Sequence, residues 1–487
     1  MSTVRQPFPY VAVFIFWISV APAVPANAAF LSLNHAIQEA IQHNPQTAAS
    51  LAVIEQAEHQ VQQARSGYHP QLFLSETLSN TNNPMWAFGT KLNQERIQLE
   101  DFVPDRLNNP SSITNSATVL GLEWPLYTGG QVGLRIDQAN IQVQGATRQA
   151  ERVRQQLIAR TVSAYSQVVL AKANLQVIED AIRTAKAYRD MIETRYRSGL
   201  VVKSDALRAQ VRVAELEQER IQAESRIQVA QAMLNSILGR AVDESFDVSD
   251  ILHSPKPLCL ESVESWEQKA LQRRPDLAAI RLKQQMAEKE VARSKAEHLP
   301  QIAMIGNYEI NSETFDDTAT NYTIGAMMKV NLYSGQRITA KTREAEAAVR
   351  QIAALKQEME SAVQVEARQA YLRLTSSYHR IAVAEKAVDQ AKEGLKIVQD
   401  RYENGLYPLV SLLDAELALK QARTAHLQAL HEYLNAGAEL ALASGEIDES
   451  FDPTDRSDQR DSVADPSRDR AEASRSQGSV MLKGEIP

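Results

Sequence analysis

The stretch that decides the fold runs from Gln131 to Arg197 and reads QVGLRIDQANIQVQGATRQAERVRQQLIARTVSAYSQVVLAKANLQVIEDAIRTAKAYRDMIETRYR. It continues through about nineteen helical turns without a proline, which predicts one rod roughly 100 Å long. A helix of this length needs neighbouring helices to cover its apolar residues. Apolar and small residues recur along it with the 4,3 spacing of a packing seam. The seam comprises Leu157, Thr161, Ala164, Val168, Ala171, Leu175, Ile178, Ile182 and Ala185.

A second stretch, 336–403, repeats this pattern at a constant offset of about 206 residues, which indicates an internal duplication. Its seam comprises Val363, Ala367, Ala370, Leu374, Ser377, Ile381, Ala384, Val388 and Ala391. Earlier in each half, Pro45 matches Pro275, and Pro70 matches Pro300, at an offset of about 230 residues. The second half is therefore shorter between its strands by about 24 residues.

The sequence predicts two units, 31–240 and 262–446, joined by a linker at 241–261. Each unit is expected to contain a short helix, two strands, a long helix and a return helix. The short helix and the return helix are each about half a long helix, so they should stack end to end beside it. Residues 1–28 have the pattern of a secretory signal, with Arg5, an apolar run and a small-x-small site at Ala26 to Ala28. Residues 447–487 are polar and rich in Ser, Asp, Arg and Pro, which predicts a disordered tail.

Within the first unit, one helix is expected from Leu33 to about residue 66, kinked near Asn44 before Pro45. Alternating residues predict strands from Gln71 and over 118–126, separated by an exposed loop at 82–115. Trp86 and Phe88 in that loop either pack within it or anchor it at an interface. Ser204 is expected to N-cap the return helix, and Gly239 to end it.

The second unit gives the clearest strand pattern, over 302–310 and 322–332, with a much shorter loop around 311–321. Its return helix is expected over 411–444. No stretch after the signal has the length of a membrane-spanning helix, so any passage through a membrane must use strands. Four strands cannot close a barrel, whereas three chains would supply enough strands for one with an opening.

We therefore expect a mainly α fold with a small β part, in which a trimeric composite transmembrane β-barrel is continued by an α-helical barrel. Helices that form such a hollow wall need a second apolar row beside the first. The long helix offers one in Ile158, Val162, Tyr165 and Val169.

Composition excludes several functions. The formal net charge is -8 and no basic stripe is present, which argues against nucleic acid as a partner. Cys259 is alone, so neither an intrachain disulfide nor a thiolate metal cluster is possible, and it is expected to be an incidental linker residue. His426 and His431 are five residues apart, off one helix face, and are assigned surface or junction roles rather than metal binding. No nucleophile motif or phosphate loop is found, so we expect neither an enzyme nor a cofactor.

The order and duplication of these motifs resemble the TolC-like outer-membrane efflux protein family over about 31–445. The resemblance rests on the paired prolines, on the strand exits at 125–130 and 332–335, and on the helix reversals Arg195-Tyr196-Arg197-Ser198-Gly199-Leu200 and Arg401-Tyr402-Glu403-Asn404-Gly405-Leu406. It implies a homotrimer in contact with outer-membrane lipid in a Gram-negative bacterium, extending into the periplasm. It further implies passive export of substrates delivered by an inner-membrane pump or type I secretion transporter and a periplasmic adaptor, or membrane fusion protein.

The resemblance also implies roles for particular residues. A gate that closes the duct at the helix turns would use Asp205, Arg401, Tyr402 and Asp414, whereas helix capping or ordinary solvated charge would explain the acids equally well. Ser411 stands where some relatives carry a second acid, which puts cation selectivity in doubt. Contacts with the adaptor are expected from Arg195, Tyr196, Gly199, Leu200, Gly405 and Leu406. The strand-to-helix junctions would use Pro125, Tyr127, Gly129, Tyr333 and Gly335.

The alternative interpretation is a secreted periplasmic coiled-coil adaptor or scaffold without a pore. The two hairpins argue against it, because their apolar faces have no evident soluble core to cover. The sequence leaves open whether drugs, metal ions or proteins are exported.

Overall fold

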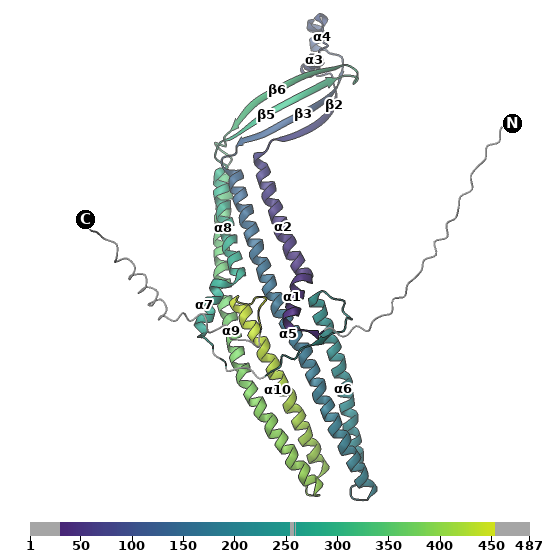
Figure 1. Ribbon diagram of the computed structural model, residues 1–487. Coiled ribbons are helices and arrows are strands. Elements are labelled where there is room, and N and C mark those ends of the chain that lie inside the picture. The colour runs from purple at the N-terminus through teal and green to yellow at the C-terminus, as the bar shows by residue number, and fades with distance from the viewer. Residues whose placement is uncertain (1–29, 254–257, 259, 453–487) are drawn as a thin grey trace, which may run out of the picture.

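The computed structural model describes residues 30–253, 258 and 260–452. Figure 1 shows an elongated molecule with a β-sheet at one end and long helices running away from it. The expected signal at 1–28, Cys259 and most of the expected tail, 453–487, lie outside the described residues. Among the helices within those bounds, none is both long and apolar enough to cross a membrane.

The long helices form as predicted. α5 (Gln131–Arg197) and α9 (Arg337–Glu403) each contain 67 residues, and their return helices α6 (Lys203–Leu238) and α10 (Leu409–Ser444) each contain 36. The prediction that Ser204 caps α6 was wrong, because Val202 occupies the N-cap position and no side chain caps that end. α10 also begins two residues before the expected start. Gly239 and Gly445 end the return helices in the left-handed region, with φ of 75° and 77°.

The single short helix predicted before the first strand is instead two helices, α1 (Leu33–His43) and α2 (Pro45–Arg65). Asn44 separates them, and its side chain caps α2 by accepting a hydrogen bond from the Gln46 amide at 2.8 Å. Proline then starts α2 at a position where its missing N–H costs nothing. The second unit breaks in the same way into α7 (Val263–Arg273) and α8 (Pro275–Ala296). As expected from the lengths, α2 and α6 follow one another along α5 (Figure 1).

The sheet joins the two units. Its antiparallel strands are β2 (Gln71–Thr81), β3 (Ile113–Tyr127), β5 (Gln301–Ser312) and β6 (Thr318–Lys329), in the order β2-β3-β5-β6. Both hairpins therefore project from the same end of the helices, as Figure 1 shows. The strand predicted over 322–332 begins four residues earlier and ends at Lys329. β2 and β6 form the two outer edges.

The segment between β2 and β3 is not the simple exposed loop that was predicted. It contains α3 (Pro84–Asn93), the 3-10 helix η2 (Leu99–Phe102) and α4 (Pro104–Asn108). The ring of Phe88 packs edge-on against Phe102 with centroids 5.8 Å apart, whereas Trp86 is 70% exposed. A buried chain of hydrogen bonds, from Gln94 to Asn115 at 2.8 Å and from Asn115 to Asn311 at 2.7 Å, ties the segment to the sheet.

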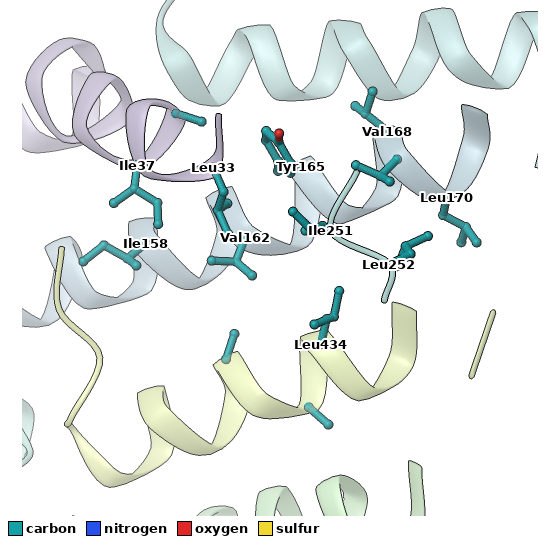
Figure 2. Close-up of a cluster of buried hydrophobic side chains, with 14 of the residues drawn as sticks. Leu33, Ile37, Ile158, Val162, Tyr165, Val168, Leu170, Ile251, Leu252 and Leu434 are labelled. Carbon is teal, nitrogen blue, oxygen red and sulfur yellow. The ribbon is translucent and has the colours of Figure 1, made fainter. Parts of the chain in front are cut away.

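The largest core lies at mid-length, where α1, α5, α6, α9 and α10 meet (Figure 2). The predicted second apolar row of α5 is buried there, including Val162 and Tyr165. The Tyr165 hydroxyl donates to the Leu31 carbonyl at 2.8 Å and accepts from the Ser249 amide at 2.8 Å. It thereby fastens the short parallel pair β1 (Phe30–Leu31) and β4 (Asp247–Val248) onto α5. The core fixes the helices relative to one another halfway along α5.

Candidate gate at the helix turns

The two helix turns far from the sheet have the same geometry. At the α5–α6 turn the Gly199 amide donates to the Tyr196 carbonyl at 2.9 Å, and the Leu200 amide donates to the Arg195 carbonyl at 2.9 Å. At the α9–α10 turn the equivalent bonds run from Gly405 to Tyr402 at 3.0 Å and from Leu406 to Arg401 at 2.8 Å. Both glycines have a positive φ, 75° and 74°, which this type of helix ending requires.

The two turns pack against each other within one chain. A separate apolar cluster joins the end of α5–α6 to the end of α9–α10. Its buried members are Tyr188, Ile192, Ala206, Ala209, Tyr402, Leu409 and Leu412. The two helical hairpins are therefore held together at their tips as well as at mid-length.

Arg195 contacts the opposite turn rather than pointing away from the chain. Its guanidinium lies over the Tyr402 ring, 5.3 Å from the centroid. It also donates to the carbonyls of Tyr402 at 3.4 Å and Glu403 at 3.1 Å. Carbonyls at a helix C-terminus attract a cation, so Arg195 links the two turns electrostatically. The resemblance to the efflux family had assigned Arg195 to an adaptor contact.

The other residues expected to contact an adaptor are exposed at the tips. Leu200 is 74% exposed and Leu406 is 68% exposed, and Tyr196 is also exposed. Gly199 and Gly405 form the tight turns beside them. They offer a surface for a partner, and whether an adaptor uses it stays a prediction.

The four gate residues lie in different surroundings. Tyr402 is only 5% exposed, and its hydroxyl lies near the Arg195 guanidinium without a well-formed hydrogen bond. Burial raises the pKa of Tyr402, and the nearby Asp205 carboxylate raises it further, whereas Arg195 lowers it. Asp205 thus lies close to Tyr402, as the resemblance implied, but the hydrogen-bonded lock between them stays a prediction. Arg401 lies over the Tyr407 ring at 5.4 Å.

Asp414 is exposed and lines a cavity of about 440 Å³ between α6 and α10. Arg208, Arg212 and Glu215 of α6 line the opposite side. Lys420 of α10 reaches across to Glu219 of α6, with Nζ to oxygen distances of 2.6 and 2.8 Å. Both signs of charge therefore face each other across this cavity.

Sequence reasoning missed Glu416. It is 4% exposed, and neither carboxylate oxygen has a hydrogen-bond partner within the described residues. Burial raises its pKa to about 7, against the opposing effects of Arg212 and Lys420. A signal was present, because Leu409, Leu412 and Glu416 follow the 3,4 spacing of the inward seam of α10.

The strand-to-helix junctions depend on left-handed residues. Gly129 has φ 63°, and a Cβ added there would lie 2.8 Å from the Leu299 Cβ atom. In the second unit Gly335 has φ 61° and is followed by Gln336 at 64°. β3 is irregular between Pro125 and Tyr127 just before its junction. Tyr127 and Tyr333, at 47% and 84% exposure, point away from the chain's own core.

Within the part of the chain that the structure describes, His, Cys, Asp and Glu side chains form no group of three or more that could hold a metal ion. The surface role expected for His431 was wrong. It is 7% exposed, and its Nε2 lies 2.9 Å from the Asn435 side-chain nitrogen.

The family model described as "Outer membrane efflux protein" matches residues 36–240 and 266–446, which together are most of the chain. The chain belongs to the outer membrane efflux protein family. The efflux protein is 25% identical over 324 residues to "Outer membrane protein TolC" of Vibrio cholerae, covering 64% of this chain and 73% of that protein. It is 22% identical over 436 residues to the TolC protein of Escherichia coli K12, covering 86% and 83% respectively.

Among solved structures, the fold of the efflux protein matches the outer-membrane channel OprN with a TM-score of 0.71. That alignment covers 85% of this chain and 90% of OprN at 17% identity, so it supports the fold alone. The family establishes a non-enzymatic efflux channel of the outer membrane, with a periplasmic extension. The alternative of a pore-free coiled-coil adaptor is set aside.

Proposed function

We propose that three copies of this efflux protein join their sheets edge to edge and form one exit duct, which their long helices continue through the periplasm. The open edges of the sheet support this proposal. β2 and β6 each pair on one side only within the described chain. In hydrocarbon the unpaired backbone groups of such edges would be costly, and a neighbouring copy would satisfy them.

The distribution of side chains over the sheet carries the proposal. Residues directly opposite one another in paired strands share a face. One such row is Leu74, Leu120, Tyr308 and Tyr322, and the next is Leu72, Leu122, Gly306 and Ile324. Rows on the other face include Ser75, Val119, Glu309 and Asn321. One face therefore suits lipid and the other suits an aqueous passage.

The exposed tips support a role for partners. In this proposal a periplasmic adaptor binds the surface around Leu200 and Leu406 and connects the duct to an inner-membrane pump. The duct is passive, because cargo is selected and driven by these partners. The signal at 1–28, the two repeats at 31–240 and 262–446, the linker at 241–261 and the tail at 447–487 belong to the same proposal.

We further propose that the turns gate the duct, with Arg195, Asp205 and Tyr402 holding the hairpins together and Arg401 and Asp414 lining the opening. Replacing Arg195 with methionine keeps apolar bulk but removes the cation from the Tyr402 ring and from two helix-terminal carbonyls. The double variant Tyr402→Phe with Asp205→Ala removes the polar atoms on the other side. Both are expected to raise the single-channel conductance of purified protein in planar bilayers severalfold.

Arg197→Met is the matched control, because Arg197 lies in the same turn and, among the described residues, pairs with Glu193 of its own helix at 3.3 Å. It is expected to conduct like the unaltered protein. A purified protein that stays monomeric and opens no pore in bilayers would contradict the duct itself. Unchanged conductance in both gate variants would contradict the gate alone.

A further inference from the structure

Glu416 is a buried acid near the tip that the proposed gate does not use. It lies on the face of α10 that packs toward the other hairpin, one turn after Leu412 in the cluster joining the tips. Its 4% exposure is a property of the single chain, so further copies around it cannot expose it more. Both of its oxygens are buried and without hydrogen-bond partners among the described residues. A carboxylate in such surroundings is stable only as the neutral acid or beside a cation.

Among the cations on other elements, Arg212 of α6 acts on the Glu416 carboxyl. Its side chain is 12% exposed, and Nη1 donates to Glu215 at 3.3 Å. Its Nε and Nη2 atoms are buried and have no hydrogen-bond partner within the described chain. Two donors on α6 and two acceptors on α10 are thus left unsatisfied, while their charges interact through space.

Other charged and titratable groups around Glu416 are already engaged. Lys420, one turn further along α10, pairs with Glu219 of α6. From α5, the Tyr188 hydroxyl donates to Gln399 of α9 at 3.2 Å. Burial raises the pKa of Tyr188 to about 12, and Glu416 and Glu403 of α9 contribute, so Tyr188 stays neutral at physiological pH.

We propose that Glu416 is a proton-controlled latch of the tip, neutral while the two hairpins are packed together and ionised when they separate. This inference rests on the proposed gate. Separation lets water, or a rotated Arg212, reach the carboxylate, which then returns toward ordinary acidity. Protons therefore favour the closed tip. The raised pKa of about 7, against 4.5 for an ordinary glutamate, agrees with this direction, because the form with the higher pKa binds the proton more tightly.

The linkage gives a defined pH profile. The ratio of closed to open tips should fall by roughly tenfold per pH unit and per chain between the two pKa values, and level off outside them. Full-length protein with Cys259→Ser can carry spin labels at Leu207→Cys on α6 and Val410→Cys on α10, which face each other across the cavity. Their separation is measured in detergent from pH 5 to pH 8, and conductance is measured over the same range in bilayers.

The unaltered latch should show label distances that lengthen from pH 5 to about pH 7 and change little above it. Glu416→Gln mimics the neutral acid, so the distance between the labels in this variant should stay short at every pH. Arg212→Met removes the cation that favours the ionised form of Glu416. The pH at which the label distance stops lengthening should therefore be higher in this variant. Glu224→Gln, an exposed acid elsewhere on α6, is the matched control and should keep the original profile.

A Glu416→Gln protein that keeps the original pH-dependent distance change would overturn the latch. Labels whose separation does not vary with pH in the unaltered sequence would do the same. The distance measurement does not depend on current through a pore. If the protein conducts at no pH but the labels still follow Glu416, the duct fails and the latch stands.

Discussion

Gly239 illustrates how a single residue joins the elements of this chain. It ends α6 with φ 75°, and a Cβ there would lie 2.6 Å from the His43 carbonyl oxygen at the break between α1 and α2. Gly445 lies in the same way against the break between α7 and α8. A Cβ added to Gly445 would lie 3.1 Å from the Arg273 carbonyl carbon. The repeated contact explains why both return helices end in glycine.

Gly239→Ala should destabilise the protein by roughly 1–3 kcal/mol, because alanine resists the left-handed conformation and its methyl group meets backbone. The midpoint of thermal unfolding in detergent measures this. Gly145→Ala is the control, since Gly145 lies inside α5 with nothing within 4 Å of an added Cβ. Alanine there should stabilise by roughly 0.5–1 kcal/mol. Equal shifts in the two variants would rule out the close contact as the cause.

At the scale of single residues, the sequence was least informative about which charged side chains are buried and which contact a distant part of the chain. Glu416 and Asp414 are two residues apart on one helix, and packing against the other hairpin buries Glu416 while Asp414 stays exposed. The resemblance assigned Arg195 to a partner surface, whereas its guanidinium lies over the Tyr402 ring of the same chain. Such contacts join residues about 207 positions apart, which local spacing does not reveal.

The elements themselves were largely predictable. Both bounds of α5 were predicted to the residue, because Gly129-Gly130 and Ser198-Gly199 interrupt a long helical period with local backbone preferences. The same logic failed for the segment predicted as an exposed loop at 82–115. There Asn83 caps α3 and proline starts it, but the hydrogen bonds of Gln94 and Asn115 that tie the segment to the sheet are a tertiary feature.

Arg240 and Glu39 tie the end of α6 to α1, with the Arg240 Nη2 atom 2.6 Å from a Glu39 oxygen. The hydrogen bond from Arg240 lowers the pKa of Glu39 below 4.5, with further lowering by its positive charge. A lowered pKa stabilises the fold at pH values above 4.5, and that contribution is lost as the pH falls through the lowered pKa.

Arg240→Gln should therefore lower the unfolding temperature by a few degrees at pH 7, with the difference from the unaltered protein shrinking as the pH falls below 4.5. Arg148→Gln provides the comparison, since Arg148 pairs with Glu151 on the exposed surface of one helix at 2.9 Å. Exposed pairs of this kind contribute little. If Arg240→Gln lowers the unfolding temperature equally at pH 7 and at acidic pH, the ion pair with Glu39 is not the cause of the lowering.

For the whole molecule, the proposed ring of copies makes β2 of one chain the neighbour of β6 in the next. Thr77 on β2 shares a face with Ala319, Asn321 and Thr323 on β6. Combining Thr77→Cys in turn with a cysteine at each of these three positions, in a Cys259→Ser background, should give disulfide-linked dimers and trimers for at least one pair. Non-reducing electrophoresis reads the result.

Thr77→Cys alone should give no trimer, because a single cysteine links at most two chains. If every pair migrates as a monomer after oxidation, the edges do not meet and the ring is wrong. The general architecture was predictable because alternation, helix length and duplication are properties of the sequence alone. The way copies meet is not, since it depends on surfaces that one chain leaves uncovered.

The hydrogen bonds of Tyr165 at mid-length hold α5 at one point along its length, so that this long helix can act as a lever about that point. The part of α5 beyond it, 166–197, contains about 32 residues and has a reach of roughly 48 Å. A pivot of about 5° at this point would sweep the far end through about 4 Å, wider than a water molecule. A partner that pulls sideways on the helix turns would therefore need only a small rotation at the mid-length core to change the width of the opening. The sheet would not need to move.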